Sequence, residues 1–110
     1  MNTKQIVRVT GMMEHQAAAS RVTHGSSAVL LVRDPSNAHD ANAIAVVNRC
    51  TNERIGFMSK RDAKSIAPFF DSGLFEIGEQ QGARIERIYN MYHCTVMFHL
   101  VQVRSSLAYA

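Results

Sequence analysis

The sequence predicts a mainly β protein of the α+β class, a small and partly open β-barrel of about six strands with one or two helices. Short apolar stretches rich in β-branched residues recur along the chain, which is typical of strands. Turn-forming residues separate these stretches at brief intervals. One segment, between Ser59 and Gly73, has the apolar spacing of a helix. Together these features favour a curled sheet with a helix covering one end.

The chain has the length of one domain. Its 110 residues can bury one core but not two. With 46% hydrophobic and 19% charged residues, the composition is that of a folded globular protein. We therefore predict a single domain over residues 1–110, with its core from about residue 7 to residue 101 and a frayed tail at 104–110.

The predicted strands are the apolar stretches between turns. They cover residues 6–11, 28–32, 43–47, 53–58, 74–77, 83–88 and 94–100. The second stretch is apolar at every position, which predicts a central strand covered on both faces. In the fourth, simple alternation places Ile55 and Phe57 on one face, and Gly56 leaves room on the other.

The helix is predicted from its cap and its apolar spacing. Ser59 is a good N-cap with Asp62 three positions later, and Gly73 ends the segment. The apolar face consists of Ala63, Ile66, Ala67 and Phe70. Pro68 lies inside this pattern, so we expect the helix to bend or restart there.

Charge and motif content favour a binding protein over an enzyme. Twelve Lys and Arg against nine Asp and Glu leave a net charge of +3, which favours an anionic partner. The sequence contains no recognisable catalytic, cofactor-binding or metal-ligand motif. We therefore expect no enzyme activity, no cofactor, no metal and no small-molecule substrate.

The same survey bears on location. Cys50 and Cys94 form no CxxC pair, which favours a reducing compartment. No stretch has the length and hydrophobicity of a signal peptide or a membrane span. We expect a cytoplasmic protein, or a nuclear one if the source is eukaryotic, without a membrane partner.

Two groups of side chains suggest a nucleic-acid surface. Lys60, Arg61 and Lys64 lie in the first turns of the predicted helix, where a phosphate would offset their unfavourable interaction with the helix dipole. The alternative is a solvated basic face. Base stacking needs exposed aromatic rings, and the candidates are Phe57, Tyr89, Tyr92 and His39.

The segment RDPSNAHDANAIAVV, residues 33–47, is long and polar for a hairpin connection. Asp34 and Pro35 are typical of the first two positions of a turn. Asp40 has two interpretations. It either stiffens the loop by accepting hydrogen bonds from nearby backbone N–H groups, or it contacts a ligand.

This segment resembles the motif of the HIRAN domain family. The matching residues are, in order, Arg33, Asp34, Pro35, Asn37, Asp40, Asn42, Ala43, Ile44 and Val46, followed by Ile55 and Gly56. A helix that ends near Gly73 comes next, and the resemblance extends from about Val7 to Leu100.

The resemblance implies a modified OB-like β-barrel that binds the 3′ end of single-stranded DNA. The family occurs in chromatin-remodelling and DNA-repair helicases, which implies a setting such as the replication fork, and in small bacterial and phage proteins. By this resemblance Asp40 accepts a hydrogen bond from the terminal 3′-hydroxyl, and Lys60 contacts phosphate.

Some pocket residues differ from those of eukaryotic members. Their Arg and Tyr at the end of the first strand are replaced by the residues of 12–15, and their Tyr before the aspartate is His39. His39 can still stack and donate a hydrogen bond. Phe57 can stack on a base, and Arg21 is the candidate for the missing cation.

Two functions are therefore carried forward. The first is a DNA-binding module for single-stranded 3′ ends, working with a helicase, a nuclease or another protein. The alternative is a protein-interaction module, for example a phage or mobile-element protein acting on a host enzyme, that kept the fold and lost the DNA pocket. Strong salt dependence of binding would favour the first.

Overall fold

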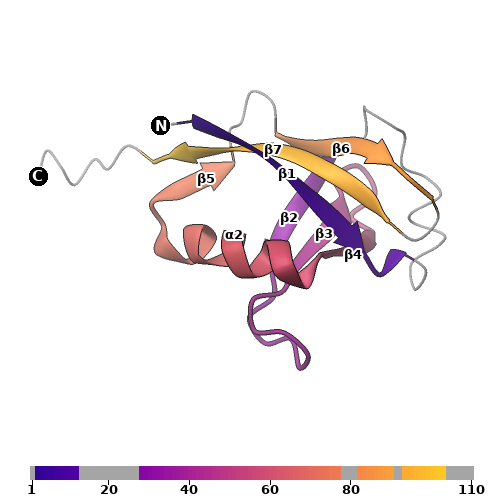
Figure 1. Cartoon of the computed structure of the whole chain (residues 1–110), viewed down its shortest axis with the longest axis horizontal. Helices are drawn as coiled ribbons and strands as arrows, with labels where there is room; N and C mark the ends of the chain where they lie inside the picture. The colour runs from indigo at the N-terminus through magenta and orange to yellow at the C-terminus, as the bar shows by residue number, and fades with distance from the viewer. Residues whose placement is uncertain (1, 13–27, 78–81, 91–92, 104–110) are drawn as a thin grey trace, which may run out of the picture.

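The computed structural model describes residues 2–12, 28–77, 82–90 and 93–103 (Figure 1). The expected tail at 104–110 lies outside these residues. Within them the chain forms one helix, α2 (Lys60–Ser72), and seven strands. The strands are β1 (Asn2–Thr10), β2 (Ala28–Arg33), β3 (Ile44–Asn48), β4 (Arg54–Met58), β5 (Phe75–Ile77), β6 (Ala83–Ile88) and β7 (Cys94–Gln102).

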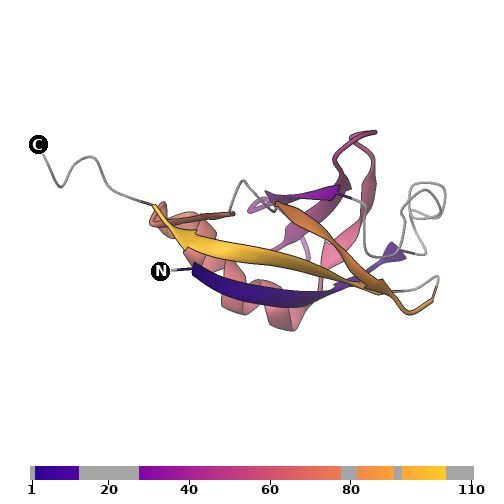
Figure 2. The same ribbon diagram turned by 90° about the horizontal axis from the view of Figure 1, so that it is seen from above.

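Six of the strands close into a barrel. The sheet order is β1-β4-β3-β2-β6-β7-β5, and β1 also pairs with β7, so the first six strands form a ring. All pairings are antiparallel. β1 runs beside β7 from Asn2↔Val101 to Val9↔Cys94, as Figure 2 shows. The three-residue β5 adds to the far end of β7. The predicted mainly β barrel with a helix is confirmed.

Two seams of this barrel are narrow. Among the described residues, β1 meets β4 only at Val9↔Met58 and Thr10↔Phe57, and β2 meets β6 only at two residue pairs. Gly56 permits the first seam, because a Cβ on that residue would lie 2.4 Å from the carbonyl oxygen of Thr10. The predicted need for space at Gly56 is thus confirmed, and its cause is the close approach of β1.

The core fills the barrel interior. Its largest fully buried side chains include Phe98, Met12, Ile44, Ile55 and Ile85. Burial of such side chains supplies the main favourable free energy of folding.

One strand differs from its prediction. β2 does not have both faces covered, because Leu30 and Val32 are 41% and 46% exposed. β2 is one strand of an antiparallel barrel, so every second side chain points outward whether it is polar or apolar. The continuous apolar run therefore signals an apolar outer surface.

A β-bulge in β4 changes the faces that were predicted for this strand. Val46 pairs with Gly56 but Val47 pairs with Arg54, which leaves Ile55 as an extra residue. Ile55 is fully buried, whereas Phe57 is half-buried and carries the Arg54 guanidinium 4.8 Å from its ring centroid. The prediction that Ile55 and Phe57 share a face is wrong, because simple alternation does not survive the bulge.

Helix α2 begins and ends as predicted. The Ser59 hydroxyl accepts a hydrogen bond from the Asp62 N–H, and Gly73 adopts a left-handed φ of 70°. The helix does not restart at Pro68, which is exposed. At that position water can satisfy the carbonyl oxygen that loses its N–H partner. Phe69, outside the predicted apolar face, is 39% exposed and makes an edge-on contact with Phe75.

Cys94 makes the stability of the barrel sensitive to alkali. Burial raises the pKa of its thiol from 9.0 to about 12. Above pH 9 the unfolded chain loses this proton while the native protein keeps it, so stability falls as pH rises. In urea unfolding above pH 9, we expect the free energy of unfolding of wild type to fall by up to about 1.4 kcal/mol per pH unit more than that of Cys94→Ala. The exposed Cys50 supplies the control, since Cys50→Ala should keep the wild-type slope.

Candidate nucleic-acid interface

The β2–β3 loop, residues 34–43, is folded by its own polar side chains. The Asn37 side-chain oxygen accepts hydrogen bonds from the N–H groups of His39 and Asp40, at 2.9 and 3.2 Å. The Asn37 amide in turn donates to Asp34. These are the side-chain turns that Asn and Asp favour, so the loop has a defined backbone despite its length.

Asp40 lies at the end of this turn. Its Oδ1 accepts a hydrogen bond from the Asn42 N–H at 2.9 Å, and its carbonyl oxygen accepts one from Ala43. The loop-stiffening interpretation of Asp40 is therefore confirmed. Among the described residues, however, Oδ2 accepts no hydrogen bond, and the side chain is partly exposed. One carboxylate oxygen thus holds the loop, while the other has no partner within the described residues.

Arg33 ties the loop to helix α2. Its Nε and Nη2 donate to the two carboxylate oxygens of Asp71, both at 2.9 Å. Its Nη1 donates to the carbonyl oxygens of Ala41 and Ala43. This bidentate geometry is specific to arginine. Figure 1 shows the loop leaving β2 and β3 and extending past α2.

The Asp71 contact identifies which face of α2 borders the loop. Lys60, Lys64 and Asp71 are separated by four and seven residues, spacings that place their side chains on one face of a helix. We call these three residues the loop face of α2. Because Asp71 binds Arg33, the exposed Lys60 and Lys64 lie along the side of the helix that the loop adjoins.

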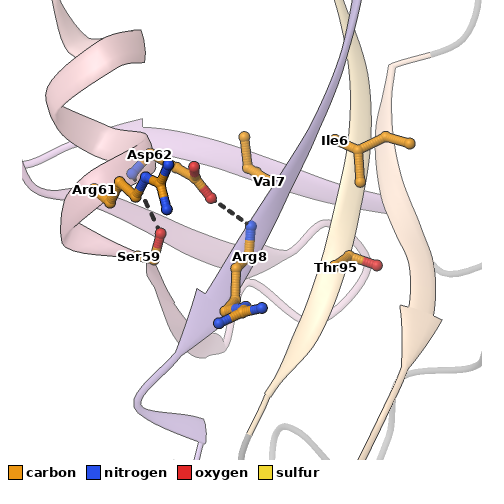
Figure 3. Close-up of a pocket in the computed structure, with 7 residues that line it drawn as sticks. All are labelled: Ile6, Val7, Arg8, Ser59, Arg61, Asp62 and Thr95. Atoms are coloured by element: carbon orange, nitrogen blue, oxygen red, sulfur yellow. Dashed lines mark hydrogen bonds between the residues drawn. The ribbon is translucent and has the colours of Figure 1, made fainter.

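The start of α2 is fastened to β1 on another side. Asp62 Oδ2 accepts from the Arg8 backbone N–H at 2.8 Å, and the Ser59 N–H donates to the Arg8 carbonyl oxygen. Figure 3 shows the shallow pocket of about 410 Å³ between these elements, with Arg61 at its rim and the Arg8 guanidinium turned away from Asp62. Arg61 therefore belongs to this pocket and not to the loop face.

Phe57 lies on the outside of the barrel, two residues before the helix cap. It pairs with Thr10 on one side and with Ala45 on the other. Of the other aromatic candidates, His39 and Tyr89 are exposed, and Tyr92 lies outside the described residues. Tyr89 stacks on His93 at the β6–β7 turn, with Arg87 above it.

Comparison with known proteins places this geometry in a family. The profile of the HIRAN domain matches residues 3–103. The chain belongs to the HIRAN family. The crystal structure of the HIRAN domain of human HLTF superimposes with a TM-score of 0.72 at 23% identity, covering 89% of this chain and 74% of that one.

Two further structures share the fold. A Lactobacillus plantarum protein matches with a TM-score of 0.74 at 19% identity, over 94% of this chain and 98% of its own. The HLTF HIRAN domain solved by NMR in its DNA-bound conformation matches with a TM-score of 0.64 at 24% identity, over 89% and 74% of the two chains. A search of curated proteins finds no match.

In this HIRAN domain the predicted site residues fall into separate groups. His39 and Asp40 share the loop, Lys60 and Lys64 share the loop face, Arg61 lines the Figure 3 pocket, and Phe57 lies on β4. No hydrogen bond or ion pair between described residues joins the loop pair to the two lysines. Arg21 lies outside the described residues, as do positions 13–15. Met12 is buried in the core and cannot serve in a surface pocket.

Arg33 is the positioning residue that sequence reasoning missed. The only signal was its place at the start of the family motif, since its partner Asp71 is 38 residues away. Arg54 was missed for a similar reason, because its contact with Phe57 depends on the bulge.

Within the described ranges, no cluster of His, Cys, Asp and Glu could hold a metal ion. The helix there is also too short and too polar to cross a membrane.

Arg33→Lys should loosen the loop without changing its charge. Lysine cannot form the bidentate pair with Asp71 and reach both carbonyl oxygens, so we expect a loss of about 1–2 kcal/mol in urea unfolding. Amide exchange in residues 37–43 should become faster. The control is Arg61→Lys, at an exposed arginine of α2, which should change neither the stability nor the exchange rates. Wild-type exchange rates in Arg33→Lys would contradict the role of this side chain.

Proposed function

We propose that this HIRAN domain binds single-stranded DNA at a free 3′-hydroxyl end and carries out no reaction itself. The observation that supports the proposal is the Arg33–Asp71 pair, which fastens the loop of Asp40 to the last turn of α2, on the same helix face as Lys60 and Lys64. Support also comes from the HLTF HIRAN domain, whose structure was determined in its DNA-bound conformation.

Asp40 reads the end of the strand. Its Oδ2, which accepts no hydrogen bond from a described residue, accepts one from the terminal hydroxyl, while Oδ1 stays bonded to the Asn42 N–H. A hydrogen bond to a carboxylate contributes about 1.5–3 kcal/mol. A terminal 3′-phosphate is repelled by the same charge, so the preference is for an unmodified end.

The DNA backbone is held by the start of α2. The N–H groups of Lys60 and Arg61 belong to the first turn, where helix N–H groups have no partner within the helix. Together with the Lys60 and Lys64 ammonium groups they form a site for phosphate oxygens. Arg61 contacts phosphate farther along the strand.

Aromatic contacts complete the site. Phe57 offers one ring face to a base while Arg54 lies over the other, and base stacking of this kind contributes about 1–3 kcal/mol. His39 is exposed next to Asp40 and can stack on the terminal base. A helicase or nuclease that acts on the same DNA end is the kind of protein with which this module works.

Asp40→Asn tests the reading of the 3′ end. Asparagine keeps the oxygen that accepts from the Asn42 N–H, so the loop is retained while the charge is removed. We expect wild type to bind a labelled single strand with a 3′-hydroxyl about tenfold more tightly than the same strand with a 3′-phosphate. In Asp40→Asn this ratio should approach one, as measured by fluorescence anisotropy.

A matched control is Glu76→Gln, which removes one exposed carboxylate from β5. It should keep the wild-type ratio. If Asp40→Asn also kept the wild-type ratio, Asp40 would have only its loop-stiffening role. If neither strand bound with the salt dependence of a phosphate contact, the protein-interaction alternative would replace the proposal.

The double variant Lys60→Ala/Lys64→Ala tests the phosphate contacts. Each phosphate neutralised on a single strand contributes about 0.7 to the slope of log K against log salt. We expect affinity to fall and the slope to shrink by about 1–1.5, with the preference for a 3′-hydroxyl unchanged. Lys4→Ala, at an exposed lysine of β1, should leave the slope as in wild type. A wild-type slope in the double variant would place the phosphate contacts elsewhere.

A further inference from the structure

Within the described residues, one edge of β2 is paired over only a third of the strand. β3 accompanies β2 from Val29 to Arg33, but β6 accompanies it only at Ala28 and Val29. Gly82, with a φ of 58°, takes the chain out of the extended conformation just before β6 begins. β5 lies against β7 and so does not extend the pairing. In the described part of the chain, no strand borders Leu30–Arg33 on this side.

The direction of the free hydrogen-bonding groups follows from the ladder with β3. Arg49 N–H donates to the Ala28 carbonyl oxygen, and Asp34 N–H donates to that of Ala43. Residues two apart in an antiparallel strand bond to the same side, so Leu30 and Val32 also bond to β3. Leu31 and Arg33 therefore direct their N–H and C=O groups toward the open edge, which can accept another strand.

Side chains beside this edge are apolar. Leu30 and Val32 are 41% and 46% exposed on the outer face, where they pair with Val47 and Ala45 of β3. Where β2 and β6 separate there is a hollow of about 460 Å³, whose lining includes Leu30, Leu31 and Ile77. An added strand would cover Leu30 and Val32 with one face and turn the alternate side chains of its other face toward the hollow.

Charge at one end of the edge indicates the chemistry of the partner. Arg49 lines the hollow, and Arg84 lies opposite Ala28 at the same end. Neither forms an ion pair with a described residue. A second copy of this chain, whose net charge is +3 and whose own β2 edge carries arginines, would not complement this charge. Acidic residues on the partner would instead complement both arginines.

We propose that the open edge of β2, Leu30–Arg33, binds an extended acidic segment of a partner protein by β-strand addition. Backbone hydrogen bonds to Leu31 and Arg33 supply the pairing, and apolar side chains at alternate positions of the segment cover Leu30 and Val32. Carboxylates at its end pair with Arg49 and Arg84. This surface uses the backbone of Arg33 but not its side chain, and it uses none of Asp40, Lys60 and Lys64, so its tests do not depend on the outcome of the DNA-binding tests.

Amide hydrogen exchange of the free protein tests the edge itself. We expect the N–H groups of Leu31 and Arg33 to exchange at least about tenfold faster than those of Leu30 and Val32, which bond to β3. The neighbouring residues of the same strand thus serve as the matched control. Equal protection of all four amides would show that the edge is closed in solution and would overturn the proposal.

A synthetic peptide tests the partner chemistry. The probe is a short peptide of alternating valine and threonine with glutamates at both ends, labelled for anisotropy. Its binding should slow exchange at Leu31 and Arg33. N-methylation of its central residues removes strand donors and should weaken binding at least about tenfold. Leu30→Thr/Val32→Thr and Arg49→Ala/Arg84→Ala should each weaken binding without changing the preference for a 3′-hydroxyl.

Four results would overturn the proposal. One is no binding of the peptide, and another is equal binding of the methylated peptide. A third is protection of Leu31 and Arg33 that rises with protein concentration, which would make a second copy the occupant. The fourth is protection of these amides by single-stranded DNA alone, which would assign the edge to nucleic acid.

Discussion

The guanidinium of Arg33 holds the β2–β3 loop in place against helix α2. It stands at the end of β2 and donates four hydrogen bonds, two to the Asp71 carboxylate and two to carbonyl oxygens at the end of the loop. A polar loop of this length loses conformational entropy when it becomes ordered, and these hydrogen bonds offset part of that loss. A single side chain therefore settles where the loop leaves the barrel and which face of α2 it borders.

Helix α2 is held on two sides, and this explains why its basic residues have a defined direction. On one side Asp71 binds Arg33, and on another Asp62 binds the backbone of β1. The helix cannot rotate about its axis without breaking one of these contacts. Lys60 and Lys64 are long and flexible side chains, yet their Cα positions relative to the loop are set by the backbone. Two exposed lysines without partners among the described residues thus keep a fixed attachment point relative to the loop.

Local signals in the sequence were enough for most of the fold. The cap at Ser59 and the stop at Gly73 were predicted because each depends on residues within one helical turn. The faces of β4 were predicted wrongly, because the bulge arises from pairing with β3 and no residue within β4 itself signals it. The same holds for the candidate site. The Asp40 turn follows from neighbouring residues, whereas the attachment of its loop to the helix face that carries Lys60 and Lys64 depends on a contact between Arg33 and Asp71.

The extra residue in β4 has a consequence for how relatives of this domain differ. Deletion of Ile55 would remove the bulge but keep Arg54 opposite Val47 and Phe57 opposite Ala45, so the aromatic ring would stay on the outer face. What the deletion would remove is a fully buried side chain of the core. A HIRAN domain without the extra residue would therefore present the same outer face on this strand over a smaller core.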